Sequence, residues 1–160
     1  MSARPATEGA LRRRLVLTAS LVTVLATAHF ADHVIRGRLV LDQRLDPAWN
    51  HSGWPFQARF SPFTISLVVV YAILLGGIAL TLRRRAWAGY WLTGAAVLAA
   101  IVTQVHLVPG PNTESPGVIL ATYDNDLLGV PAVVVTFAIV ASLLLLAWQA
   151  LVVRRRSGRW

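Results

Sequence analysis

Residues 12–36 read RRRLVLTASLVTVLATAHFADHVIR and join an arginine triplet, a long apolar run and a polar end in one segment. The apolar run over residues 15–35 has the length of roughly 20 residues that a helix needs to cross the hydrocarbon core of a membrane. His29, Asp32 and His33 lie in its last two turns. The segment therefore predicts a membrane helix with its ionisable side chains at one end.

The rest of the chain has the composition of a membrane protein. Hydrophobic residues make up 56% and charged residues 14% of the sequence, against roughly 25% charged in soluble domains. Three further apolar stretches cover residues 63–82, 87–108 and 127–153. Because backbone groups in lipid must be hydrogen-bonded within the segment, helices are favoured over strands. We expect an all-α integral membrane protein, in which residues 1–160 form a single four-transmembrane-helix bundle.

The arginines predict the orientation of this bundle. All 15 basic residues are arginine, and triplets occupy residues 12–14, 83–85 and 154–156. By the positive-inside rule these clusters face the cytoplasm, so we expect both termini to be cytoplasmic. We expect the protein to lie in the plasma (inner) membrane. Residues 36–62 and 109–126 then form two longer outer loops. The clusters lie at span ends rather than on one soluble face, so the net charge of +8 does not indicate nucleic-acid binding.

The first span offers a metal-binding pattern. His29, Asp32 and His33 stand at positions i, i+3 and i+4, so a helix presents them on one face. This spacing allows two imidazoles to bind one ion beside a carboxylate. An ionisable group inside a span normally faces the bundle interior and marks a functional site. Arg36, four residues after Asp32, can also form a plain ion pair with that carboxylate.

Other segments can extend this cluster at the same membrane face. His106 ends the third span, Asp124 begins the fourth, where the helix dipole favours a carboxylate, and His51 lies in the first outer loop. The candidate metal ligands are His29, His33, His106, Asp32 and, as a further candidate, His51. Asp32 and Asp124 are candidates for proton transfer.

The side chains available as ligands limit which cofactors the site can bind. The chain has no cysteine, which excludes disulfides and thiolate ligands. Imidazole and carboxylate suit zinc, iron, manganese or copper. Haem between His29 and His106 is an alternative, although we expect an ion rather than haem. A hydrogen-bonded polar cap without metal is the structural alternative.

Two classes of function fit these patterns. The first is a membrane protein whose outer-face metal site serves chemistry at the membrane interface or metal handling. The second is a non-catalytic accessory or scaffolding subunit, whose aromatic loop at residues 49–60 contacts a membrane-protein partner. An oligomeric channel or carrier is a third, weaker alternative, because the centres of spans two and four carry no ionisable residue. Enzymatic activity and oligomeric state stay open.

Residues 12–28 also resemble a secretory signal. They have a basic start, an apolar core and the small-residue sequence Ala26-Thr27-Ala28. Cleavage there would make His29 the new amino terminus. The apolar run continues as a helix beyond Ala28, so we expect an uncleaved span.

Overall fold

A computed structural model describes residues 4–44, 61–84, 88–108, 113–123 and 126–156 of the chain. These residues form five helices: α1 (Arg4–Asp42), α2 (Pro62–Leu82), α3 (Ala88–His106), α4 (Pro116–Tyr123) and α5 (Asp126–Arg156). Four of them, α1, α2, α3 and α5, are long and apolar enough to cross a membrane. The all-α prediction is confirmed, and the four apolar helices indicate a membrane protein.

The predicted spans match the helices except at the first. The second, third and fourth apolar helices cover Phe63–Leu82, Ala88–His106 and Leu127–Arg155, within two residues of the predicted bounds. The first covers Glu8–Asp42, so the prediction that a loop starts at residue 36 is wrong. The helix continues because its last turns have a packing partner: Val40 is only 1% exposed, and Leu39 packs against a small apolar cluster of α4 and α5.

The start of α2 is encoded locally. The Ser61 hydroxyl accepts a hydrogen bond from the backbone N–H of Thr64, and the Thr64 hydroxyl accepts one from the backbone N–H of Ser61. This reciprocal pair is a capping box, and Pro62 stands at the first helical position, where its missing N–H costs nothing. The helix therefore begins sharply at Pro62.

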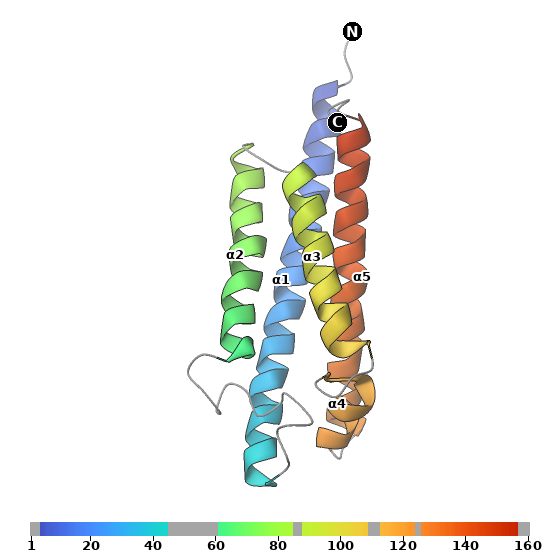
Figure 1. Cartoon of the computed structure of the whole chain (residues 1–160). Coiled ribbons are helices and arrows are strands. Elements are labelled where there is room, and N and C mark those ends of the chain that lie inside the picture. The colour runs from blue at the N-terminus through green and yellow to red at the C-terminus, as the bar shows by residue number, and fades with distance from the viewer. Residues whose placement is uncertain (1–3, 45–60, 85–87, 109–112, 124–125, 157–160) are drawn as a thin grey trace.

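The long helices run alongside one another (Figure 1). The start of α1, the end of α5 and the step from α2 to α3 lie at one end of the bundle, and α4 lies at the other. The arginines at residues 12–14, 83–84 and 154–156 thus lie at or near one end, which we call the arginine-rich end. We call the opposite end the α4 end.

Helices α1, α2, α3 and α5 share the main apolar core, which includes Leu15, Leu74, Trp91 and Leu143. Helix α2 lies beside α1 and meets α3 near the arginine-rich end (Figure 1). Two hydrogen bonds join α2 and α3 there. The Tyr90 hydroxyl donates to the backbone carbonyl of Ile73, and Trp91 Nε1 donates to Thr81 Oγ1, each at 2.7 Å.

Large apolar side chains cover the outside of the bundle. Val24, Val68 and Trp148, from three different helices, are 66%, 64% and 61% exposed. Water-soluble monomers rarely expose extensive apolar surface, whereas lipid tails solvate it well. This surface agrees with helices that lie in a bilayer.

The short helix α4 lies within the region that we predicted as the second outer loop. Its Ile119 and Tyr123 pack with Ala132 of α5 and Leu39 of α1. This second cluster holds the segment that precedes α4 against the ends of α1 and α3. That segment contains Glu114, whose backbone N–H donates to the carbonyl of Val105 in α3 at 2.9 Å.

Candidate metal centre

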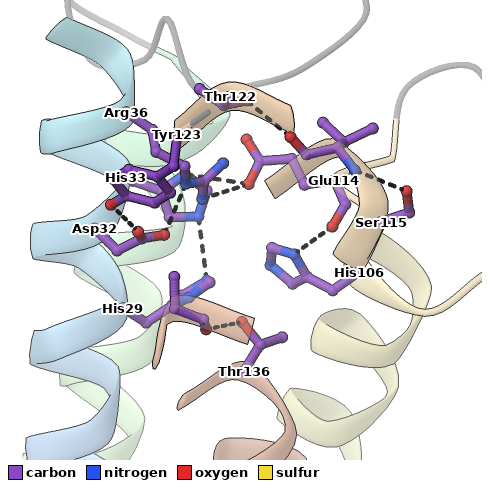
Figure 2. Close-up of polar contacts among 12 residues, drawn as sticks. His29, Asp32, His33, Arg36, His106, Glu114, Ser115, Thr122, Tyr123 and Thr136 are labelled. Atoms are coloured by element: carbon purple, nitrogen blue, oxygen red, sulfur yellow. Dashed lines mark hydrogen bonds and ion pairs between the residues drawn. The ribbon is translucent and has the colours of Figure 1, made fainter. Parts of the chain in front are cut away.

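Three histidines meet at the α4 end of the bundle. His29 and His33 lie one turn apart on α1, and His106 is the last residue of α3. All three are buried, and one ring nitrogen from each lies within 4.8 Å of the others. Figure 2 shows the His106 ring opposite His29 and His33, so side chains far apart in sequence face one another.

The α1 pair is in direct contact. His29 Nε2 and His33 Nε2 are 3.1 Å apart, and the two rings meet edge to face with centroids 4.6 Å apart. The His106 ring meets the His29 ring in the same way, with centroids 4.8 Å apart. Because a hydrogen bond needs one donor, only one of the two facing Nε2 atoms carries a proton.

The hydrogen-bond partner of His106 determines its tautomer. His106 Nδ1 lies 3.1 Å from the backbone carbonyl of Glu114. A carbonyl only accepts, so Nδ1 carries the proton and Nε2 keeps a lone pair. A metal-binding histidine typically donates its other ring N–H to a carbonyl or a carboxylate in this way.

Glu114 connects the histidines to an ion-pair network. Its side chain is 0% exposed, and its Oε2 accepts a hydrogen bond from Arg36 Nη2 at 2.9 Å. The same oxygen lies 3.5 Å from His33 Nδ1. Glu114 therefore contacts His106 through its carbonyl and faces His33 through its carboxylate, and it can orient both rings.

Arg36 joins two carboxylates that come from different segments. Its Nε donates to Asp32 Oδ2 at 2.8 Å, one turn back on α1, while Nη2 reaches Glu114. Arg36 is 0% exposed, and burial of a charge is tolerable only with such complete pairing. The hydroxyl of Tyr123 in α4 donates to the other oxygen of Asp32. The network, seen in Figure 2, ties α1, α4 and the 113–115 segment together.

His29 Nδ1 and Glu114 Oε1 are buried side-chain atoms without a hydrogen-bond partner among the described residues. When the histidines are neutral, the site contains the two carboxylates of Asp32 and Glu114 but only one guanidinium, that of Arg36. The negative charges then outnumber the positive charge. A buried net negative charge next to three imidazoles favours a cation at this place.

The surroundings of Tyr123 affect the pKa of its hydroxyl. Burial, then its hydrogen bond to Asp32 and the negative charge of that residue, raise the pKa of the Tyr123 hydroxyl above its ordinary value. The phenol therefore stays protonated at neutral pH and acts as a donor to Asp32.

The structure brings together part of the predicted site. His29, His33 and His106 converge, whereas Asp32 turns to Arg36 and Tyr123 and is not among the three residues that form the possible metal cluster. The Asp32–Arg36 ion pair is the one that their spacing allowed. His51, Asp124 and the aromatic loop 49–60 lie outside the described residues.

Two residues of the site were not predicted from sequence. Glu114 and Tyr123 both lie within residues 109–126, whose sequence predicts an outer loop. The available signal for Glu114 was its isolation: it is the only acidic residue between Asp46 and Asp124. Its partner Arg36 is 78 positions away, so no local spacing could reveal the pair.

The geometry favours an ion over haem. A porphyrin ligated by His29 and His106 would have to lie between their rings. These rings are in edge-to-face contact, with centroids 4.8 Å apart, and would have to separate to admit a flat macrocycle.

Comparisons with protein families, curated proteins and solved structures found no match to this chain. The fold and the site therefore define the class: a helical bundle with four membrane-length helices and a buried three-histidine cluster.

Proposed function

We propose that this membrane protein binds one transition-metal ion through His29, His33 and His106. The observation that carries the proposal is the convergence of three buried imidazole nitrogens within 4.8 Å, from two helices that are distant in sequence. Nitrogen ligands bind zinc at about 2.0–2.1 Å, so two ligands of a tetrahedral ion lie about 3.3 Å apart. The three nitrogens lie at most 4.8 Å apart, so binding an ion requires them to approach one another by up to about 1.5 Å.

The surroundings of the rings support metal binding. His106 keeps the lone pair on Nε2, because its Nδ1 donates to the Glu114 carbonyl. His33 has the Glu114 carboxylate near its Nδ1, which suits a carboxylate–histidine–metal arrangement. A divalent ion also offsets the excess negative charge of Asp32 and Glu114 over Arg36. In this proposal Asp32 positions Arg36 and is not a ligand.

Three protein ligands leave one position of a tetrahedral ion open for water or a substrate. An ion in that state lowers the pKa of bound water or polarises an oxygen of a substrate. The function proposed here is therefore metal-centred chemistry at a membrane interface, or metal handling, and among the four candidate metals zinc, iron and copper suit three imidazole ligands.

The arginine triplets support an orientation for the site. By the positive-inside rule the arginine-rich end faces the cytoplasm, so both termini are cytoplasmic and the α4 end faces outward. The metal would then lie near the outer face of the plasma (inner) membrane.

Thermal unfolding in mild detergent tests the proposal. Protein stripped with a chelator is titrated with zinc, iron(II), manganese or copper, and the midpoint is recorded. A ligand that binds only the folded state stabilises it by about 2.7 kcal/mol at 100 times its Kd. The wild type should be stabilised by at least one metal, and His106→Ala should lose most of that gain.

Asp42→Ala is the matched control, because Asp42, the last residue of α1, is exposed and forms an ion pair with exposed Arg38. It should keep the full response to metal. No response of the wild type to any of the four metals, or equal responses of wild type and His106→Ala, would refute the proposal.

A further inference from the structure

A cavity of about 420 Å³ lies among α1, α2, α3 and α5 and reaches the three histidines. His29, His33 and His106 all line it, so their rings form one of its walls. Small-molecule sites in proteins usually have volumes of about 300–1,000 Å³. The cavity therefore has the size of a ligand site and adjoins the candidate metal centre.

The cavity is elongated along the helices. On α2 its lining runs from Phe63 to Leu74, which is about 16 Å at a rise of about 1.5 Å per residue. On α3 it runs from Leu98 to His106, or about 12 Å. This direction is also that of the lipid tails around a membrane-spanning bundle.

The lining is polar at one end only. Apart from the three histidines and Ser66, every lining residue is hydrophobic. Such a cavity does not retain water, and an empty one forfeits packing contacts. Inside a bilayer the molecules that can fill it are lipids, and the polar end selects one whose head group bonds to imidazole or to a metal.

The closed polar end limits the size of that head group. Glu114 lies 3.5 Å from His33 Nδ1 at the α4 end and is bonded to Arg36, and both of these side chains are 0% exposed. Because these side chains close the polar end, a small head group is favoured over a bulky phosphate, and two tails would need about twice the volume of one. The shape fits one tail and a small head group.

We propose that the cavity binds a single-tailed lipid, with its alkyl or isoprenoid tail beside α2 and a small oxygen-bearing head group at the three histidines. This inference rests on the proposed function, because the oxygen of the head group takes the open position of the metal. It names the substrate class of that site: a long-chain acid, alcohol or ketone dissolved in the membrane.

Equilibrium binding of radiolabelled palmitate and farnesol to the protein in nanodiscs tests the inference. Palmitate carries an alkyl tail and a carboxylate, and farnesol an isoprenoid tail and a hydroxyl. Val70→Trp fills the cavity, because Val70 lines it. Val69→Trp is the matched control, since its neighbour Val69 is 42% exposed and does not line the cavity.

The wild type should bind at least one of the two probes. Val70→Trp should weaken binding by about tenfold or more, which corresponds to about 1.4 kcal/mol, while Val69→Trp stays close to wild type. His106→Ala should also weaken binding. Each variant must elute from size exclusion as the wild type does, and Val102→Phe replaces Val70→Trp if the latter misfolds.

Three results would overturn the inference: no binding of either probe, equal binding by the two tryptophan variants, or unchanged binding by His106→Ala. Failure of the metal proposal gives a different pattern. In that case the purified protein lacks metal while Val70→Trp and His106→Ala still weaken lipid binding, so the imidazoles bond the head group directly and the cavity inference stands.

Discussion

At the scale of single residues, the polar site depends most on Arg36, which links its two carboxylates. One fully buried guanidinium bonds Asp32 on its own helix and Glu114 from the segment before α4. Buried ion pairs of this kind are not strong net contributors to stability, but removing one partner leaves the other charges buried without compensation. The histidines depend on Arg36 indirectly, because Glu114 faces His33 and contacts His106.

Replacing Arg36 should therefore destabilise the protein strongly. Arg36→Met leaves two buried carboxylates without a cation, and a loss of about 3–5 kcal/mol is expected. Arg38→Met is the control, since Arg38 pairs with Asp42 where their side chains are 66% and 53% exposed, and it should change stability by at most about 1 kcal/mol. Thermal unfolding in detergent measures both, and equal midpoints would contradict the network.

Tyr123→Phe removes the donor to Asp32 and should cost about 1–3 kcal/mol at neutral pH. Because the folded state raises the pKa of Tyr123 above the value of about 10 for an unfolded tyrosine, the stabilisation is complete below about pH 10. It is lost as the pH rises further. The difference in stability between wild type and Tyr123→Phe should stay constant from pH 7 to pH 9 and shrink above pH 10. A difference that shrinks already below pH 9 would contradict this assignment.

The sequence predicted the residues whose partners are local. His29, Asp32 and His33 share a helical face, and Arg36 stands one turn beyond Asp32, so spacing alone indicates these contacts. Glu114 and Tyr123 find their partners in α1 only after the chain has folded back. The spacing of residues along the sequence does not reveal such a contact. For this reason the sequence around Glu114 predicts a loop and not a part of the site.

At the scale of elements, the contact between α2 and α3 depends on a glycine. A Cβ on Gly77 would lie 2.5 Å from ring atoms of both Trp91 and Tyr90. The absence of a side chain lets these rings approach α2, where Trp91 donates to Thr81 and Tyr90 to Ile73. This contact holds the arginine-rich end of α2, while the cavity occupies the space further along.

Gly77→Ala should force these rings apart and destabilise the protein by about 1–3 kcal/mol, as overpacking does. Gly89→Ala is the control in the neighbouring helix, because nothing lies within 4 Å of a Cβ at that position. It should be neutral or slightly stabilising, since alanine favours helix. Thermal midpoints of the two variants decide this, and the packing account would be wrong if both behaved alike.

The spans themselves were predictable because hydrophobicity over about 20 residues is a strong signal. The residue at which α1 ends could not be predicted in this way. Residues 36–42 contain three charged residues and resemble a loop, but Leu39 is packed by Ile119 and Tyr123. Helix α4 supplies that packing, and its presence is a property of the tertiary fold.

At the scale of the whole molecule, the gathering of the arginine triplets at one end agrees with their assignment to one membrane face (Figure 1). Because the natural chain lacks cysteine, single-cysteine variants report orientation without background. Asn112→Cys should react with a membrane-impermeant maleimide in intact cells, whereas Ser157→Cys should react only after permeabilisation. The reverse pattern would place the histidine site on the cytoplasmic side.

The central claim is that three histidines from two helices bind one metal ion. Its most direct test is the metal content of protein purified in mild detergent without chelator, measured by mass spectrometry of the elements against protein concentration. We predict about one transition-metal ion per chain for the wild type and essentially none for a variant with His29, His33 and His106 all changed to alanine. A wild type without stoichiometric metal, or a triple variant that retains it, would contradict the claim.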